Sequence, residues 1–429
     1  MIIALGFAAV LALMLLRVPI GIALGLVGTL GFASFIGITP ALRSIGSIAS
    51  DTVMTYDFAV IPMFILMGNL IARAGVSEDL FRTSYAWFGA MRGGLGLATI
   101  ASCGGFSAVS GSSVATAATM ARVAVPPMRR YGYSDALAAG SVAAGGTLGI
   151  LIPPSIVLVI YGIMTESDIG ALFIAGIVPG LLGILLYMVA IWIWAFLRPG
   201  IAPAAAPVPF REKIASLKGV TGILLLFGLV IGGIYLGFFT PTEAAGVGAF
   251  GALLIALARR RLTFRNLVDT VHDSAVTSVA LLTILIGALI FANFINVARL
   301  PQMLGDFVQD VGLTPYMVIL AMVCVYLVLG CLLESMSMLL LTVPIFYPIA
   351  ASLGFDLIWF GILVVVVIEI AMITPPIGMN IFIIRAVLPD VPVTTIFRGV
   401  IPFVLADLVR IALLLLVPGV ALWLPGLMR

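Results

Sequence analysis

Two short polar stretches interrupt long apolar runs in this 429-residue sequence. The first reads SGSS, from Ser110 to Ser113, and Thr116 follows it by one helical turn. The second reads LESMS, from Leu333 to Ser337, and contains the carboxylate of Glu334. Stretches this polar and flexible are unfavourable in the middle of a lipid-facing helix. We therefore expect two tips of re-entrant helical hairpins, which supply hydroxyls and peptide amides to a site inside a membrane.

A double proline follows each polar stretch, at Pro153–Pro154 and at Pro375–Pro376. Proline lacks an N–H and its ring clashes with the preceding turn, so each pair predicts an interrupted helix. The carbonyls freed at the end of a half-helix suit a cation such as Na⁺, and the amides freed at the start of a half-helix suit an anion. One such pair alone would be explained as a tolerated kink. Two pairs in equivalent surroundings favour a binding site.

Single residues near these stretches leave alternatives open. Glu334 either binds ion or substrate, or it faces water or pairs with an arginine, because ionisable groups inside a membrane are costly. Asn380, four residues after the second proline pair, could donate or accept a hydrogen bond at the break. The AAGGTL stretch, 143–148, would let the first tip approach closely. Asp407 and Arg410, spaced i and i+3, are interpreted as a structural ion pair.

The whole composition indicates a membrane protein. The chain is 63% hydrophobic and 9% charged, with a net charge of +3 and a mean hydropathy of +1.29. Continuous apolar runs of spanning length, such as Ala171–Phe196, predict helices, because barrel strands would alternate. The apolar start has no basic region before it, so we expect an uncleaved first span. The predicted fold class is an all-α polytopic membrane protein. Cys103, Cys324 and Cys331 match neither a zinc site nor a disulfide framework.

An internal repeat emerges when the sequence is shifted so that Pro153–Pro154 falls on Pro375–Pro376, because the same shift places Ser113 on Ser335. Loops that are basic in one half are neutral in the other, as expected when equivalent loops lie on opposite sides of the membrane. We predict a first inverted repeat at 1–200, a cytoplasmic linker at 201–218 and a second inverted repeat at 219–429. The expected hairpins are at about 92–130 and about 314–350, and the expected broken helices are at about 134–165 and about 356–388.

Several segments together carry a resemblance to a known family. SGSSVATAATM, GTLGILIPPSI, FFTPTEAA and ITPPIGMNIF resemble signature segments of the large membrane (permease) subunit of tripartite ATP-independent periplasmic (TRAP) transporters. The resemblance covers essentially the whole chain and implies an elevator-type fold of the wider ion-transporter superfamily. It also implies Na⁺-coupled import of an organic anion, such as a C4-dicarboxylate, a sialic acid or another carboxylate.

The resemblance implies partners and a location as well. A periplasmic binding protein would deliver the substrate, and a small four-helix membrane subunit, expected as a separate chain, would complete the permease. The chain would be a multi-pass protein of the bacterial inner membrane, with Na⁺ as coupling ion and no further cofactor.

The residues and the resemblance together define a candidate site with the substrate between the two tips. Sodium and substrate binding is expected at Ser110, Gly111, Ser112, Ser113, Thr116, Gly146, Thr147, Gly149, Pro153, Pro154, Ser155, Leu333, Glu334, Ser335, Ser337, Thr374, Pro375, Pro376, Gly378 and Asn380. Within that set, the expected Na⁺ ligands at the two sites are Ser112, Ser113, Gly149, Ser335, Thr374 and Gly378.

The sequence also bears on two other functions. An intramembrane enzyme is disfavoured, because the only histidine, His272, lies in a polar amphipathic segment, and the sequence has no HExxH motif. The sequence also has no nucleotide-binding P-loop. A stand-alone sodium/carboxylate symporter of the same superfamily, needing no binding protein, remains the alternative to the TRAP permease.

Overall fold

The computed structural model describes residues 1–330 and 333–428, and this part of the chain is helical, without a β-strand. The helices of the first half are α1 (Ile2–Leu15), α2 (Ile20–Ile36), α3 (Ile38–Met54), η1 (Tyr56–Ala59), α4 (Val60–Arg73), α5 (Val76–Phe88), α6 (Gly94–Ser110), α7 (Ser113–Arg130), α8 (Asp135–Thr147), η2 (Leu148–Ile150), α9 (Ile156–Thr165), α10 (Ile169–Leu197) and η3 (Pro199–Ile201). Those of the second half are α11 (Phe210–Tyr235), α12 (Pro241–Ala258), α13 (Phe264–Val297), α14 (Leu300–Val311), α15 (Pro315–Gly330), α16 (Ser335–Ser352), α17 (Leu357–Ala371), α18 (Met379–Val387), α19 (Val393–Leu416), α20 (Gly419–Leu422) and η4 (Pro425–Leu427).

The surface of the molecule is that of a protein solvated by lipid. Seven helices of the described chain are long and apolar enough to cross a bilayer. Large apolar side chains point outward along them, for example Leu181 and Leu185 on α10 and Leu224 and Leu225 on α11. In water such surfaces would drive aggregation, so this multi-helix chain is a multi-pass membrane protein.

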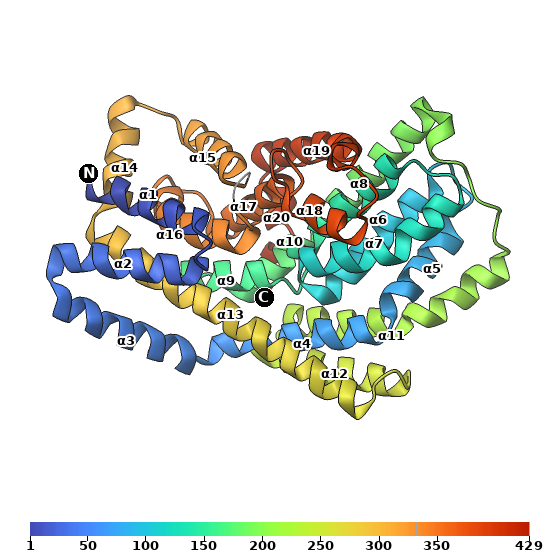
Figure 1. Ribbon diagram of the computed structural model, residues 1–429, viewed down its shortest axis with the longest axis horizontal. Helices are drawn as coiled ribbons and strands as arrows, with labels where there is room; N and C mark the ends of the chain where they lie inside the picture. Colours follow the sequence, from blue (N-terminus) through green and yellow to red (C-terminus); the bar gives the residue numbers. More distant parts are fainter. Residues whose placement is uncertain (331–332, 429) are drawn as a thin grey trace.

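The helices form an outer row and a central block. In Figure 1, α2, α13, α4, α12 and α11 run along one side of the molecule, α3 lies below α2, and most of the other helices lie above this row. Close packing of α2 on α13 depends on small residues: a Cβ added at Gly21 would lie 2.8 Å from the Cα of Ile284, and one at Gly28 would lie 2.7 Å from the Cα of Phe291. We refer to this row as the scaffold.

Two helical hairpins lie at opposite ends of the central block, α6–α7 on one side and α15–α16 on the other (Figure 1). The first hairpin turns at Gly111, which has φ +59°, a backbone conformation that suits glycine. A side chain there would also collide with the carbonyl oxygen of Pro154, 2.9 Å from the added Cβ. In the second hairpin, residues 331 and 332, including Cys331, lie outside the described residues.

Both proline pairs interrupt helices, as predicted. At Pro153–Pro154, α8 continues into the short η2 turn, and the helix ends there. The next helix, α9, begins after Ser155, whose hydroxyl accepts a hydrogen bond from the Leu158 amide at 3.3 Å. At Pro375–Pro376, α17 ends before the prolines at Ala371, and α18 begins after them at Met379. The Pro153–Pro154 and Pro375–Pro376 peptide bonds are both cis. The fold therefore contains the two hairpins and the two broken helices expected from the sequence.

Elements recur in the same order in the two halves, but one part of the chain is divided differently. The 34-residue α13 is continuous, whereas α3, η1 and α4 occupy the equivalent part of the first half. The predicted linker, 201–218, is helical from Phe210 onward, because the segment after Pro209 is rich in residues that favour a helix. Only 202–209 of that linker lacks helical structure.

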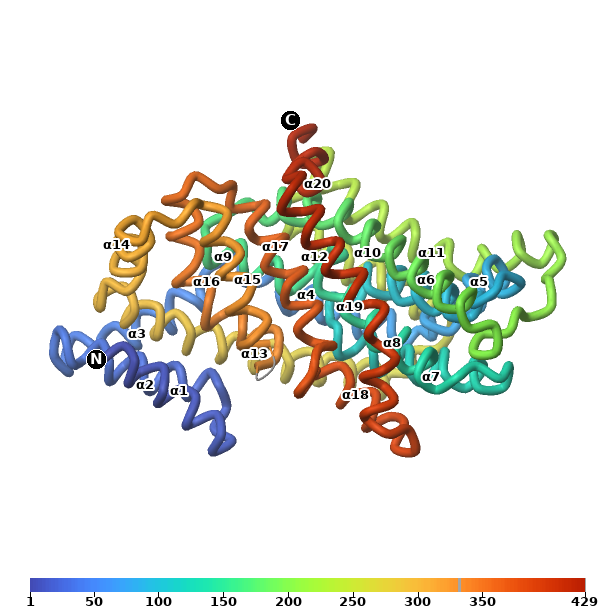
Figure 2. Tube along the Cα trace, turned by 90° about the horizontal axis from the view of Figure 1, so that it is seen from above, coloured from blue at the N-terminus to red at the C-terminus, as the bar shows by residue number. Residues whose placement is uncertain are grey.

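α19 crosses the middle of the molecule (Figure 2), where it packs on α8, α10 and α17. This helix therefore joins the first-half and second-half parts of the central block.

Candidate functional site

The two hairpin tips line one cavity of about 340 Å³, which is within the size range of small-molecule sites. Its walls come from the first tip, the ends of the first break, the second tip and two scaffold helices. Its lining residues are Ile65, Asn69, Ser110, Gly111, Ser112, Ser113, Val114, Ala115, Ala118, Ile150, Ile156, Thr277, Leu281, Glu334, Ser335 and Met336. Among these residues, Glu334 alone carries a charge.

Three helices begin at this cavity. Ser113 starts α7, Ile156 starts α9 and Ser335 starts α16, and all three residues line its wall. The first amides of a helix have no acceptor within the helix, and the helix dipole adds a partial positive charge at that end. Three helix N-termini, the kind of helix end that favours an anion, therefore lie at the wall of this cavity.

A compact network of oxygens holds the first tip. The hydroxyl groups of Ser110 and Thr116 are 2.7 Å apart, and the Thr116 hydroxyl also donates to the carbonyl oxygen of Ser112 at 2.8 Å. The Ser112 hydroxyl caps α7 by accepting from the Ala115 amide at 3.3 Å. Ser113 is buried and donates to the sulfur of Met372 at 3.5 Å, at the end of α17. These hydrogen bonds hold the hydroxyl and carbonyl oxygens of the first tip close together.

The first break packs directly on that tip. A Cβ added at Gly149 would lie 2.7 Å from the carbonyl oxygen of Ser112 and 3.0 Å from the Thr116 hydroxyl. Gly146 has the same role one turn earlier, where an added Cβ would lie 2.8 Å from that of Ala117. The buried hydroxyl of Ser155 donates to the carbonyl oxygen of Ile150, so it ties the two sides of the break together.

Glu334 organises the second tip as the cap of α16. Its carboxylate accepts hydrogen bonds from the Ser337 amide at 2.7 Å and from the Ser337 hydroxyl at 2.9 Å. The Ser335 hydroxyl lies 3.4 Å from the other carboxylate oxygen. The side chain is only half-buried, and its carboxylate lines the cavity.

The expected residues of the second break are not among those that line the cavity. The Thr374 hydroxyl donates to the carbonyl oxygen of Ile370 at 2.6 Å, and Gly378 has φ +59° as α18 begins. Asn380 is fully buried; its amide nitrogen donates to the carbonyl oxygen of Ala143 in α8 at 3.2 Å. Its Oδ1 has no hydrogen-bond partner among the described residues, which leaves a buried oxygen at the break.

The structure brings some of the expected site residues to the cavity and leaves others away from it. Ser110 to Ser113, Glu334 and Ser335 line it, and Thr116 and Gly149 contact the first tip. Other expected residues do not line it: Gly146, Thr147, Pro153, Pro154, Ser155, Leu333, Ser337, Thr374, Pro375, Pro376, Gly378 and Asn380. Of these, Pro375 and Pro376 are exposed at the second break.

Sequence reasoning did not identify the scaffold side of the cavity. Asn69 of α4 and Thr277 of α13 line it, and the Asn69 amide donates to the hydroxyl of Ser274 at 2.8 Å. A lone asparagine in the apolar run around Asn69 was the available signal, since polar residues within spanning helices commonly face a partner or a cavity. Which cavity they face depends on contacts between segments that are far apart along the chain.

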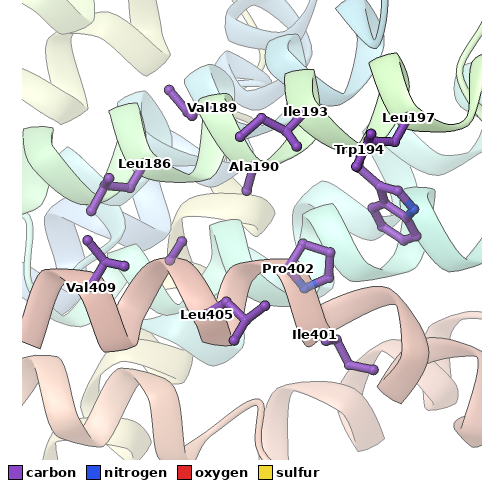
Figure 3. A pocket seen from close by; sticks show the side chains of 11 residues that line it. Leu186, Val189, Ala190, Ile193, Trp194, Leu197, Ile401, Pro402, Leu405 and Val409 are labelled. Atoms are coloured by element: carbon purple, nitrogen blue, oxygen red, sulfur yellow. The ribbon is translucent and has the colours of Figure 1, made fainter.

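A larger groove between α10 and α19 is of a different kind. It has a volume of about 360 Å³ and is lined by Leu186, Val189, Ala190, Ile193, Trp194, Leu197, Ile401, Pro402, Leu405, Ala406 and Val409 (Figure 3). These side chains are aliphatic or aromatic, and several of them, such as Ile193 and Leu405, are exposed on the outer surface. The groove is therefore almost entirely apolar and lies on the outer surface of the molecule.

Outside the spanning region, an ion pair links the two halves of the chain. Arg129, at the end of α7, donates to Asp390 at 2.6 Å and to Asp135 at 2.6 Å. The hydrogen bond from Arg129 lowers the pKa of Asp390 below its ordinary value. The first hairpin is thereby connected to the loop that follows the second broken helix.

Comparison with known proteins agrees with this architecture. Residues 7–420 match the family described as tripartite ATP-independent periplasmic transporter, DctM component. The C4-dicarboxylate TRAP transporter large permease protein DctM of Pseudomonas aeruginosa is 39% identical over 405 residues, covering 94% of this chain and 93% of that protein. The sialic acid TRAP transporter large permease protein SiaM of Vibrio cholerae is 34% identical over 374 residues, covering 87% of each.

A solved structure shares the fold at low sequence identity. The Alcanivorax borkumensis YdaH transporter superimposes with a TM-score of 0.64 over 91% of this chain and 90% of that one, at 15% identity. The extent of the family match and the identity to its large permease proteins together decide the assignment. The chain belongs to the DctM-component family of tripartite ATP-independent periplasmic transporters, the large permease proteins of these systems.

Proposed function

We propose that this chain is the large transmembrane subunit of a sodium-coupled secondary transporter of the bacterial inner membrane. It would import a small organic anion, a C4-dicarboxylate, a sialic acid or a similar carboxylate. A periplasmic binding protein would deliver the anion, and a small four-helix membrane subunit would complete the permease. A stand-alone symporter is the competing proposal, and uptake without the partner proteins would identify it.

The observation that supports an anionic cargo most strongly is the convergence of three helix N-termini on one cavity. The starts of α7, α9 and α16 present their first amides to a space large enough for a small carboxylate. The Ser112 hydroxyl, which accepts a hydrogen bond from the Ala115 amide, adds a further donor. Because Glu334 already occupies the start of α16, we place the anion nearer the starts of α7 and α9.

The proposed role of Na⁺ rests on the oxygens around the two tips. The first cation position uses the Ser112 and Ser113 region with the carbonyl end at Gly149. The second uses Ser335, Thr374 and Gly378. Neutral carbonyl and hydroxyl oxygens at half-helix ends are the ligands that coupling Na⁺ takes in transporters with broken helices. The unpartnered Oδ1 of Asn380 supports a cation near the second break.

In this proposal, Na⁺ offsets the repulsion between Glu334 and the anionic cargo. A carboxylate and an anionic cargo that share one cavity repel each other. A cation held between them removes that repulsion, so Na⁺ would raise the affinity for the anion. Ion binding and cargo binding would then be thermodynamically coupled.

The proposed motion is of the elevator type. The hairpins, broken helices and α19 form one packed block, and the cavity lies between this block and Asn69 and Thr277 of the scaffold. Movement of the block along the scaffold would carry the tips and their contents from one side of the membrane to the other.

Uptake by proteoliposomes tests the proposal. The chain, reconstituted with a small membrane subunit and a binding protein, should accumulate labelled succinate or N-acetylneuraminate only with an inward Na⁺ gradient. Replacing Na⁺ by choline should abolish uptake. Equal uptake in choline would refute sodium coupling, and uptake by the lone chain would establish the stand-alone symporter instead.

A matched pair of variants connects uptake to the tip. Thr116→Ala removes a hydroxyl that joins Ser110 to Ser112, and it should lower uptake by at least about tenfold, which equals a loss of about 1.4 kcal/mol. Thr283→Ala removes an exposed hydroxyl of α13 that bonds only within its helix, to the carbonyl oxygen of Val279 at 2.7 Å. That control should transport like the unchanged protein.

A further inference from the structure

A second cluster of polar side chains lies inside the central block, away from the cavity between the tips. It consists of Glu369 on α17, Asp407 and Arg410 on α19, and Tyr187 on α10, and all four are fully buried. We call these four residues the buried charge cluster. None of them lines the cavity described above, so the proposed transport site gives them no function.

The contacts within the buried charge cluster are direct. Nη2 of Arg410 donates to Oδ1 of Asp407 at 2.6 Å, and the same nitrogen donates to Oε2 of Glu369. The Tyr187 hydroxyl donates to Oδ2 of Asp407 at 2.7 Å, and its ring lies 5.8 Å from the Cζ of Arg410. Gly183 of α10 makes room for the guanidinium, because a Cβ there would collide with Nη1 of Arg410.

The charges of the cluster do not balance if every group is ionised. Two carboxylates and one guanidinium sum to one net negative charge, in a place that is fully buried inside the protein. An uncompensated buried charge is very unfavourable, and a buried acid avoids that by taking up a proton. The cluster needs one more positive charge to be neutral.

We propose that the buried charge cluster binds one proton and keeps it as a resident part of the structure. The two carboxylates differ in how well they are satisfied. Asp407 accepts a hydrogen bond on each oxygen, from Arg410 and from Tyr187, which suits a carboxylate ion. Oε1 of Glu369 has no hydrogen-bond partner among the described residues. Since an unsatisfied charged oxygen costs more than a neutral one, the proton resides on Glu369.

The position of the cluster suggests what the proton stabilises. The hydroxyls of Tyr187 and Thr147 are 3.4 Å apart, so the cluster continues to the end of α8, beside the first break. The shift that superimposes the two proline pairs also places Thr147 on Glu369, shortly before the second break. The cluster thus connects the equivalent ends of both broken helices. A neutral cluster would hold them together as one body without carrying charge across the membrane potential.

The net charge of the cluster in each variant predicts its thermal stability, so the proposal can be tested by mutation without the cargo. Glu369→Gln leaves Asp407 and Arg410 as a neutral pair, and Asp407→Asn leaves Glu369 and Arg410 as a neutral pair. Each single variant should therefore purify well and melt within about 3 °C of the unchanged protein. The double variant leaves Arg410 alone and buried. It should melt at least about 6 °C below the value expected if the two single effects were additive.

Infrared spectroscopy of the purified protein detects a protonated carboxyl group directly. The unchanged protein should show the carbonyl stretch of a protonated carboxylic acid, shifted in deuterated water, and Glu369→Gln should lack it. Asp407→Asn should also lack it, although Glu369 is intact there, because Glu369 then ionises to pair with Arg410. Asp273→Asn, which changes an exposed carboxylate, should leave the band unchanged.

Two results would overturn the inference. The first is an infrared difference between the unchanged protein and Glu369→Gln that contains no acid carbonyl band, since both carboxylates would then be ionised. In that case Na⁺ could supply the missing charge, and removing Na⁺ would lower the melting temperature of the unchanged protein but not that of Glu369→Gln. The second is a double variant whose melting temperature equals the additive value.

Discussion

At the scale of single residues, a substitution at Gly149 gives the sharpest test of how the first tip packs on the first break. The Cβ of an alanine there would lie 2.7 Å from the carbonyl oxygen of Ser112 and would push the first tip away from the break. Gly149→Ala should reduce Na⁺-driven uptake by at least about tenfold, a loss of about 1.4 kcal/mol in binding or transport. Gly246→Ala is the matched control, because an added Cβ at Gly246 on α12 meets nothing within 4 Å. Equal uptake by both variants would contradict the packing argument.

Glu334 provides a second test at this scale. Glu334→Gln keeps an acceptor for the Ser337 amide but removes the charge that a cation would meet in the cavity. The Na⁺ concentration for half-maximal uptake should rise by about tenfold, while the melting temperature should change little, because the cap is retained. A variant with unchanged Na⁺ dependence would show that Glu334 acts only as a helix cap.

Some residues of the site could be predicted from their type alone, and others could not. Ser110 to Ser113 and Glu334 stood out because polar groups within apolar runs have few explanations. Glu369 carried the same signal, in the run VVVVIEIAMI, yet its partner Arg410 is 41 residues away and no local spacing connects them. The pairing of Asp407 with Arg410 was predictable from the i, i+3 spacing and is confirmed.

At the scale of elements, α2 and α13 show how closely the scaffold is packed. Gly28 of α2 lies against the backbone of Phe291, whereas an added Cβ at Gly25 would have no contact closer than 3.6 Å. Gly28→Ala should destabilise the protein by about 1–3 kcal/mol through overpacking. Gly25→Ala should be nearly neutral. Thermal melts of both variants would check this, and equal melting temperatures would refute it.

Helix boundaries could be predicted from the sequence where a single residue type determines them. The proline pairs ended helices because proline removes a donor and collides with the preceding turn. The start of α11 at Phe210 was missed, since the proline- and alanine-rich stretch before it obscured a helix that begins after Pro209. The continuity of α13, where the first half has three elements, follows from tertiary packing that the repeat alone does not encode.

At the scale of the whole molecule, the repeat explains why distant segments meet. Its constant offset pairs the hairpins and the broken helices, but it says nothing about the scaffold side of the cavity. Asn69 and Thr277 become part of the site only when α4 and α13 pack beside the central block. The fold was thus predictable from local patterns, whereas the complete wall of the cavity depended on packing.

The central claim is that one cavity between the two tips holds both the organic anion and its coupling cation. The most direct measurement is a cryo-electron microscopy structure of the assembled permease in saturating Na⁺ and succinate, compared with one in choline. We predict anion density beside Ser112 and Ser113 at the starts of α7 and α9, together with Na⁺-dependent density at the tips. Succinate bound elsewhere, with this cavity unchanged between the two conditions, would contradict the account.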